Sequence, residues 1–146
     1  MINIVPLSKD NLEDVCEIEK LSLSTAWGKK EMEKELENKN AVYFCAKKDE
    51  ETVGFIGMWN IAGEGNITNV AVHPEFRRNG IGKLLVNEMI SYSKSNNLVF
   101  LTLEVSENNK NAYSLYKKCG FYEVGRRKKY YSNKFDAILM QYDIEI

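Results

Sequence analysis

The sequence predicts an α+β protein in which a mostly antiparallel sheet contains one parallel pair of strands. Strand and helix patterns follow one another in the order βααβββαβαββ. A helix separates the strand ending at Val72 from the apolar run 98–105, and strands joined through a helix in this way pair in parallel. The 146 residues, 44% of them apolar, can form one core, so we expect a single domain over residues 1–146.

The amino-terminal half is predicted to contain two helices followed by a hairpin. Pro6 ends a short first strand because it has no N–H to donate, and Ser8 is suited to cap the helix that follows. In that helix Leu12, Val15 and Ile18 recur on one face, whereas the second helix has few apolar residues and should lie on the surface. The predicted elements are strands at 2–5, 41–47 and 52–61 and helices at 9–21 and 29–37.

The carboxyl-terminal half alternates strands and helices around a central strand. The run 98–105 is almost continuously apolar, which is typical of a strand buried on both faces. Residues 63–65 should turn the chain into the central strand, and Gly120 should cap the last helix. The predicted elements are strands at 69–72, 98–105, 121–124 and 137–144 and helices at 81–92 and 110–119.

A short basic loop connects the central strand to the helix after it. The helix is indicated by apolar residues at spacings of three and four, namely Ile81, Leu84, Leu85, Met89 and Tyr92. Gly80 and Gly82 allow the backbone of the loop to approach a ligand closely. Unpaired N–H groups at the positive end of the helix dipole, beside Arg77, Arg78 and Lys83, are therefore suited to bind a phosphorylated ligand.

Two common phosphate loops do not fit this segment. In a Walker loop Arg77 would have to be glycine, and Leu84 would have to be the Ser or Thr that binds magnesium. In a dinucleotide fingerprint Leu85 would occupy the place of the third glycine. The pattern Arg/Gln-x-x-Gly-x-Gly/Ala does fit, as Arg77-Arg-Asn-Gly80-Ile-Gly82 directly after the strand.

In this pattern the segment resembles the coenzyme A pyrophosphate loop of the GNAT acetyltransferase superfamily. The resemblance implies a three-layer fold with helices on both faces of the mixed sheet. It implies acetyl-CoA as cosubstrate and no metal. It also implies the coenzyme-binding residues Val70, Ala71, Val72, Arg77, Arg78, Asn79, Gly80, Ile81, Gly82, Lys83 and Asn109, the last by a hydrogen bond to the pantetheine arm.

Motifs later in the chain narrow the resemblance. They are Leu103-Glu104-Val105, Asn109, Ala112-x-x-Leu115-Tyr116-x-x-x-Gly120-Phe121, Arg127-x-x-Tyr130-Tyr131 and Asp136-Ala137-x-x-Met140. With the central loop they are similar in order and spacing to the RimI-type ribosomal-protein alanine N-acetyltransferases, over roughly residues 50 to 143. The resemblance implies transfer of acetyl to a protein N-terminal amine, with the alanine of a small-subunit ribosomal protein as the expected acceptor.

Acetyl transfer from a thioester to an amine needs a neutral amine, a stabilised oxyanion and a proton for the leaving thiolate. Glu104 fits a general base that acts directly or through water, with a solvated carboxylate at a strand edge as the alternative. Tyr116 fits the proton donor, although an aromatic residue on a helix can equally belong to the core. The resemblance assigns both to the catalytic pair. Backbone N–H groups of residues 70–72 would polarise the acetyl carbonyl.

Three other features favour structural interpretations. His73, the one histidine, abuts Pro74 in a turn and suits a surface position rather than catalysis. Cys119 lies on an apolar helix face without a base partner, which favours packing. The run 126–129 is basic, but four charges in a nearly neutral chain favour a solvated strand edge over a nucleic-acid patch.

Composition excludes several classes of protein. The formal charge is -1, from 20 Lys and Arg against 21 Asp and Glu, which argues against nucleic acid as a partner. No stretch approaches the ~20 apolar residues of a membrane span, and the amino terminus lacks the apolar run of a signal peptide. Cys16, Cys45 and Cys119 are odd in number and form no metal-ligand pattern, so we expect reduced thiols in a cytoplasmic protein.

The acceptor is the least determined part of the predicted function. Trp27, Tyr130 and Tyr131 are candidates to wall a peptide channel, with simple packing as the alternative. A lysine side chain or a small amine is the first alternative acceptor, and a non-catalytic acyl-CoA-binding module is an alternative of another class. Glu104 and Tyr116 argue against the module, because binding alone requires neither residue.

Overall fold

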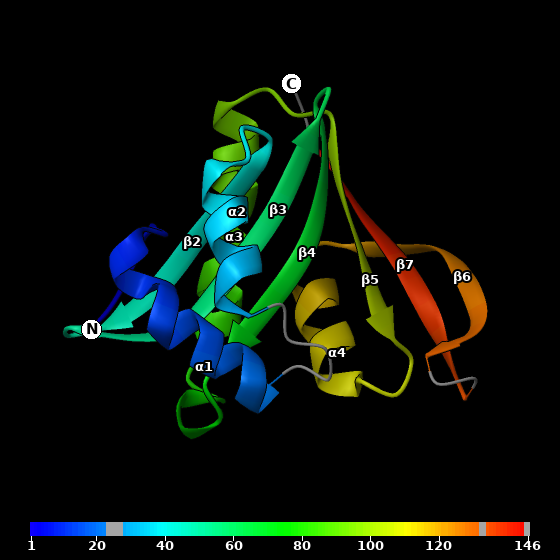
Figure 1. Cartoon of the computed structure of the whole chain (residues 1–146). Coiled ribbons are helices and arrows are strands. Elements are labelled where there is room, and N and C mark those ends of the chain that lie inside the picture. Colours follow the sequence, from blue (N-terminus) through cyan, green and yellow to red (C-terminus); the bar gives the residue numbers. More distant parts are fainter. Residues whose placement is uncertain (23–27, 132–133, 145–146) are drawn as a thin grey trace.

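Seven strands form one mixed sheet and four α-helices cover its two faces in the part of the chain that the computed structural model describes, residues 1–22, 28–131 and 134–144 (Figure 1). The side chains of residues 22 and 129–131 also lie outside that description. The elements are β1 (Ile2–Pro6), η1 (Lys9–Asn11), α1 (Leu12–Ser22), α2 (Lys29–Glu37), β2 (Ala41–Lys48), β3 (Glu51–Ile61), β4 (Glu64–Val72), η2 (Pro74–Phe76), α3 (Ile81–Ser95), β5 (Phe100–Ser106), α4 (Lys110–Lys118), β6 (Tyr122–Tyr131) and β7 (Phe135–Asp143).

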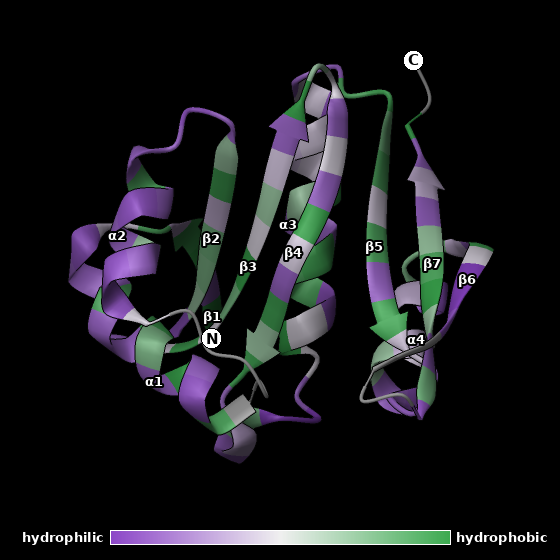
Figure 2. Cartoon of the chain, turned by 45° about the vertical axis from the view of Figure 1, so that its right-hand side comes forward, coloured by the Kyte–Doolittle hydropathy of each residue, from purple (hydrophilic) through white to green (hydrophobic). Residues whose placement is uncertain are grey.

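The strands lie in the order β1-β2-β3-β4-β5-β7-β6, and only β4 and β5 run parallel among the pairs of the described chain. Their pairing is short and extends only from Glu64 opposite Phe100 to Asn66 opposite Thr102. Beyond these positions β4 continues to Val72 and β5 to Ser106, and the two strands diverge (Figures 1 and 2). The predicted mixed sheet with one parallel pair is confirmed.

A β-bulge in β4 changes which side chains face which layer. Gly57 of β3 lies opposite Asn69, but its neighbour Met58 lies opposite Ile67, so Thr68 is the extra residue. Before the bulge, Ile67 packs in the core beneath α3, whereas after it Ala71 packs in the core beneath α1. The bulge therefore exchanges the two faces of β4 just where β4 leaves β5.

Two apolar cores lie on opposite faces of the sheet. The larger joins α3 and α4 to the sheet, and its central members are Ile56, Met58, Leu85, Met89, Leu101, Leu103 and Met140. The smaller joins α1 and α2 to the sheet through Leu12, Val15, Ile18, Met32, Tyr43, Phe55 and Ala71. Figure 2 shows that α2 is otherwise mostly hydrophilic. The three-layer arrangement and the inward positions predicted for α1 are confirmed.

Some predicted boundaries and faces are wrong. The first helix begins as the 3-10 turn η1, in which the Ser8 N–H donates to Asn11 Oδ1 at 3.1 Å. Gly65 lies inside β4 and not in a turn. An added Cβ there would meet Leu101 at 2.6 Å, so the strand packs closely on the core at this position. Leu84, predicted to face inward, is 42% exposed. The first two residues of the run 98–105 precede β5, which begins at Phe100.

Strand β5 is also not buried on both faces, contrary to prediction. Leu101, Leu103 and Val105 are buried, whereas Thr102 and Glu104 between them are partly exposed. The reason is that α1 packs on β3 and β4 and α2 packs on β2, so neither helix lies over β5. The apolar run 98–105 does not indicate that helices cover only one face of β5.

Besides its apolar contact through Met32, helix α2 is hydrogen-bonded to the sheet through the carboxylate of Glu35. Glu35 Oε2 accepts hydrogen bonds from the Tyr43 hydroxyl at 3.0 Å and from Trp59 Nε1 at 2.7 Å. Burial, and then the nearby Glu35 carboxylate, raise the pKa of the Tyr43 hydroxyl well above its usual range, so the phenol stays a donor. The Tyr43 ring lies against Gly57, where an added Cβ would meet ring atoms within 3 Å.

We therefore expect Gly57→Ala to lower the free energy of unfolding by about 1–3 kcal/mol, the usual cost of overpacking. The Tyr43 ring cannot simply turn away, because its hydroxyl is bonded to Glu35. Urea denaturation measures the effect. Gly125→Ala is the matched control, since a Cβ there meets Leu139 at an ordinary 3.5 Å. Equal stability of the two variants would contradict the close approach.

Candidate active site

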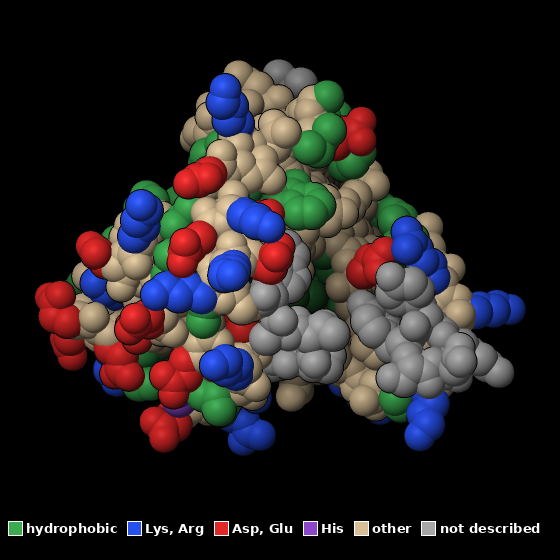
Figure 3. All heavy atoms as spheres, viewed as in Figure 1, with side chains coloured by type: hydrophobic (Ala, Val, Ile, Leu, Met, Phe, Trp, Pro, Cys, Tyr) green, Lys and Arg blue, Asp and Glu red, His purple; other side chains and the backbone are tan. Residues whose placement is uncertain are grey.

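The site is built where β4 and β5 separate, beside the loop that leads from β4 to α3. The space-filling view of the α1 and α2 face shows the surface hollowed to the right of α2 (Figure 3). His73 N–H donates to Val53 O at 2.8 Å, so by alternation Ala71 turns its N–H toward β3. Val70 and Val72 then turn their N–H groups toward the gap, where β4 has no strand partner among the described residues.

The loop after β4 is held by its own side chains. His73 Nδ1 accepts a hydrogen bond from the Glu75 N–H at 3.1 Å, and the imidazole meets the Phe76 ring edge-on at 5.7 Å. Arg77 Nε donates to Val72 O at 3.2 Å, and Asn79 Nδ2 donates to Phe76 O at 3.2 Å. The histidine thus supports a turn, in agreement with the surface position predicted for it.

The two loop glycines, Gly80 and Gly82, have different structural roles. Gly80 is the N-cap of α3 with φ +76°, a left-handed conformation that favours glycine, and Arg78 shares that region with φ +68°. Gly82 brings α3 close to α4, since an added Cβ would lie 3.0 Å from Leu115 Cδ2 of α4. The side chains of Arg77, Arg78 and Lys83 are exposed around the start of α3, as a phosphate site requires.

Glu104 lies on the α1 and α2 face of β5, with its side chain 28% exposed. Its Oε1 is 3.3 Å from Nη1 of Arg127, whose backbone lies opposite Ala137 on β7. The arginine therefore reaches across the small side chain of Ala137 to meet the carboxylate. Glu104 is the fifth residue of a seven-residue strand and not its last, so it stands beside the gap and not beyond it.

Tyr116 lies in the core on the opposite face of the sheet. It is 8% exposed on α4, packs in the core that contains Leu103, and lies with its ring 6.1 Å from that of Phe121. Because Glu104 and Leu103 alternate on β5, the carboxylate and the phenol belong to different sides of the sheet. A reacting group could be reached by both only where β4 and β5 are apart.

Asn109 has a structural function in the described chain. It is the N-cap of α4, and its Oδ1 accepts a hydrogen bond from the Ala112 N–H at 3.2 Å. A contact with a pantetheine arm would therefore use the Nδ2 amide. The aromatic candidates are not placed: Trp27 lies outside the described residues, and Tyr130 and Tyr131 are described only as backbone of β6.

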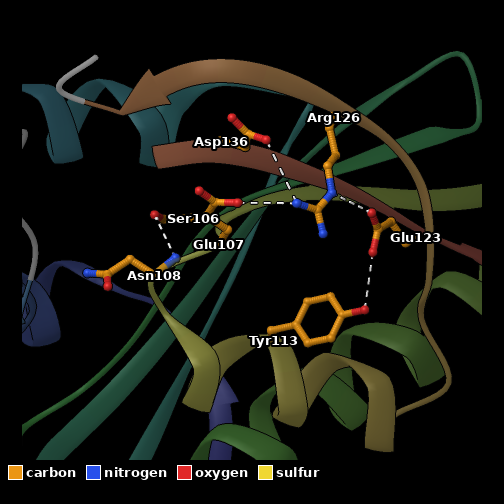
Figure 4. A network of polar contacts seen from close by, with 7 residues as sticks. All are labelled: Ser106, Glu107, Asn108, Tyr113, Glu123, Arg126 and Asp136. Carbon is orange, nitrogen blue, oxygen red and sulfur yellow. Dashed lines mark hydrogen bonds and ion pairs between the residues drawn. The ribbon is translucent and has the colours of Figure 1, made fainter. Parts of the chain in front are cut away.

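A polar network that the sequence did not reveal ties β6 and β7 to the loop after β5 (Figure 4). Arg126 lies 2.7 Å from Glu123, 3.2 Å from Glu107 and 3.8 Å from Asp136. Glu123 also accepts from the Tyr113 hydroxyl of α4 at 3.2 Å. Hydrogen bonding to Arg126 lowers the pKa of the Glu123 carboxyl, and the same bond raises the pKa of the guanidinium.

The sequence predicted a solvated strand edge for the basic run 126–129. The structure differs, because the first two residues of the run form ion pairs. Arg126 and Arg127 point to opposite faces of the sheet, the first to three carboxylates and the second to Glu104. Glu123 is three residues before Arg126 on the same strand, but Glu104, Glu107 and Asp136 lie outside β6, so the sequence shows no local pattern for those three pairings. The network positions the β6–β7 hairpin beside the candidate site.

The thiols are poorly suited to nucleophilic chemistry. Burial raises the pKa of the Cys45 thiol to about 12, and burial also raises the pKa values of Cys16 and Cys119. All three are free; Cys45 is buried, and Cys16 and Cys119 are partly buried where they pack against the two cores. Packing of Cys119 rather than catalysis remains the better interpretation.

Within residues 1–22, 28–131 and 134–144, no three His, Cys, Asp or Glu side chains are placed to hold a metal ion. No helix in the same residues is both long and apolar enough to cross a membrane.

Comparison with known proteins identifies the family. The model of the Acetyltransferase (GNAT) family matches residues 12–121. A Bacillus subtilis protein, provisionally named ribosomal protein bS18-alanine N-acetyltransferase, is 36% identical over 133 residues, which are 90% of this chain and 88% of that protein. The Salmonella typhimurium ribosomal protein bS18-alanine N-acetyltransferase is 30% identical over 100% of both chains.

The structural comparison agrees. The crystal structure of the Escherichia coli ribosomal-protein-S18-alanine N-acetyltransferase has a TM-score of 0.92 at 26% identity and covers 100% of this chain and 96% of that chain. The chain therefore belongs to the GNAT family of acetyltransferases, and the sequence resemblance to the RimI-type enzymes is confirmed. It is an N-acetyltransferase. The Arabidopsis thaliana NAA60 structure in complex with acetyl-CoA shares its fold at a TM-score of 0.88 and 22% identity and covers 99% of both chains.

The two possible effects of Gly82→Val can be separated. The added side chain should abolish the rise in melting temperature that acetyl-CoA causes, either by crowding the phosphate or by pushing Leu115 away. Gly82→Val/Leu115→Ala relieves only the second effect. We expect the double variant to recover stability but not the acetyl-CoA shift, as measured by thermal denaturation with and without the coenzyme.

Gly82→Ala serves as the control, since its single methyl group meets only the flexible end of Leu115. It should keep most of the acetyl-CoA shift. Recovery of the full shift in the double variant would mean that Gly82 acts through helix packing and that the pyrophosphate lies elsewhere.

Proposed function

We propose that this protein transfers acetyl from acetyl-CoA to the N-terminal amine of a protein, with the N-terminal alanine of ribosomal protein bS18 as acceptor. The observation that carries the proposal is the gap between β4 and β5, where Glu104 lies on β5 and Val70 and Val72 direct their N–H groups from β4. The names of the Bacillus subtilis and Salmonella typhimurium relatives support the choice of acceptor. On this proposal the chain works in the cytoplasm.

The proposed roles follow from position. Glu104 takes a proton from the acceptor ammonium, directly or through water, and so makes the amine nucleophilic. The N–H groups of Val70 and Val72, directed into the gap, stabilise the negative charge that develops on the acetyl oxygen as the N–C bond forms. Tyr116 donates its hydroxyl proton to the sulfur as the C–S bond breaks. The attacking nitrogen loses its second proton through water to the tyrosinate, so the acceptor becomes an amide, the coenzyme a thiol and Tyr116 a phenol again.

The coenzyme fits the residues assigned to it. Arg77, Arg78 and Lys83 surround the amino terminus of α3, and Gly80 turns the backbone so that helix N–H groups face outward. Burial of Tyr116 limits water around the proton that it donates. Arg127 Nη1, 3.3 Å from Glu104 Oε1, holds the carboxylate in position.

An N-terminal amine suits this site better than a lysine side chain. Its pKa is roughly 8 against roughly 10.4 for lysine, so at neutral pH about a tenth of the α-amine is already neutral. We expect a peptide that begins with alanine to be acetylated at its terminus, while a terminally blocked peptide with an internal lysine reacts far more slowly. Incubation with labelled acetyl-CoA followed by mass spectrometry measures both.

Equal or faster reaction of the internal lysine would replace the α-amine proposal with the lysine alternative. Reaction of small amines alone would point to a small-molecule acceptor. Binding of acetyl-CoA without transfer to any amine would instead support the non-catalytic module.

The catalytic assignments are tested by two conservative substitutions. We expect Glu104→Gln and Tyr116→Phe each to lower kcat by about a hundredfold or more, the usual contribution of a general base or acid. Both should leave acetyl-CoA binding intact, because neither change alters the loop between β4 and α3.

Matched controls are available for both substitutions. Tyr113→Phe removes a hydroxyl one turn earlier on α4, where it bonds Glu123, and Glu107→Gln alters a carboxylate that faces Arg126. Both controls should keep near-normal turnover. Unimpaired turnover in Glu104→Gln and in Tyr116→Phe, with chemistry limiting the rate, would remove the assignment.

A further inference from the structure

The sheet face that carries Glu104 continues above the gap as an exposed surface of two rows of side chains. Its residues follow from the register, since side chains paired across neighbouring strands share a face. Gly65 faces the α3 core, so its neighbours Glu64 and Asn66 face the α1 and α2 side. Trp59 faces the same side, because its indole N–H reaches Glu35 of α2.

The first row crosses five strands. Trp59 lies opposite Asn66, Asn66 opposite Thr102, Thr102 opposite Gln141, and Gln141 opposite Tyr122. Hydrogen bonds link its members: Asn66 Nδ2 donates to Thr102 Oγ1 at 3.4 Å and Gln141 Nε2 to the Tyr122 hydroxyl at 3.4 Å. Trp59 is 36% and Tyr122 43% exposed, so the row ends in two accessible aromatic rings.

The second row is shorter and contains two carboxylates. Ile61 lies opposite Glu64, Glu64 opposite Phe100, and Phe100 opposite Asp143. Asp143 accepts from Gln141 Nε2 and from the Tyr122 hydroxyl, both at 2.7 Å. These bonds, Gln141 first, lower the pKa of the Asp143 carboxyl and keep it ionised. We call the two rows together the platform.

The charge and chemistry of the platform indicate what it would bind. None of its nine side chains is basic, whereas Glu64 and Asp143 are both exposed carboxylates. Trp59, Phe100 and Tyr122 offer ring faces, which attract cations and pack against the methylene stems of lysine and arginine. In Figure 3 hydrophobic and acidic side chains gather at the upper right of this face, above the hollow.

The platform is continuous with the proposed catalytic base. Thr102 and Phe100 precede Glu104 on the same face of β5 by two and four residues, which places the rows about 7 and 13 Å from it. An extended chain advances about 3.3 Å per residue. A peptide with its terminal amine at Glu104 would therefore reach the first row with about its third residue and the second row with about its fifth.

We propose that the platform binds the segment of the acceptor that follows the acetylated terminus, and that it selects lysine or arginine at about the third to sixth positions. The proposal rests on the proposed function, because it places the acceptor amine at Glu104. The positive side chains would meet Glu64 and Asp143, and their stems would lie on Trp59 and Phe100. Specificity for the acceptor then resides partly in the sheet and not only in the loops around the gap.

The test uses two acceptor peptides with the same first two residues, alanine foremost, one with lysines and one with glutamines at positions three to six. We expect a lower KM for the lysine peptide, with similar kcat. The double variant Glu64→Gln/Asp143→Asn should raise KM for the lysine peptide about threefold to tenfold, as for exposed ion pairs, and leave the glutamine peptide unchanged. Raising the salt concentration should remove the preference.

The matched control is Glu50→Lys, which changes the charge at the opposite end of β3, whereas Glu64→Lys changes it on the platform. Only the second substitution should reverse the peptide preference. Binding of the same peptides, measured by fluorescence anisotropy in the presence of coenzyme A, gives a readout independent of turnover.

The outcomes separate the two proposals. Turnover of both peptides with equal KM would overturn the platform and leave the proposed function standing. Lysine-peptide binding that depends on Glu64 and Asp143, without any turnover, would retain the platform and overturn the function. A dimer that dissociates on Trp59→Ser substitution, measured by light scattering, would assign the surface to a second copy of the chain and overturn the proposal.

Discussion

The short pairing of β4 with β5 is the constraint on which the rest of the molecule depends. The two strands pair only at three positions, whereas each pairs over most of its length on its other side, β4 with β3 and β5 with β7. Backbone groups of Val70 and Val72 are consequently directed into a gap rather than into a ladder. The bulge at Thr68 lies at the same place and turns alternate β4 side chains to the opposite face.

Polar side-chain contacts support the sheet on both sides of the gap. Glu35 fixes α2 to β2 and β3 through Tyr43 and Trp59, and Arg126 fixes the β6–β7 hairpin to the loop after β5. Each half of the sheet beside the gap is therefore tied by its own side-chain contacts. Such contacts matter for acyl transfer, since catalytic groups on different elements must keep one geometry.

The incomplete cover of the sheet has a second consequence. Because α1 and α2 lie over β2 to β4, the same face of β5, β7 and β6 remains partly exposed. Glu104 stands at the border of the covered and exposed regions, with Thr102 next to it on the exposed side. On the proposed function, Glu104 in this partly exposed position would be reachable by the acceptor's chain end.

The sequence by itself determined the features that depend on neighbouring residues: the order of helices and strands, the basic glycine loop before α3, and the motifs that identify the family. Local patterns suffice there, because hydrophobic periodicity and backbone conformation are set within a few residues. Tertiary structure alone decided the rest. The faces of β5, the partners of Arg126 and Arg127, and the packing of Gly82 against Leu115 depend on strand register and helix placement, which join residues far apart in the chain.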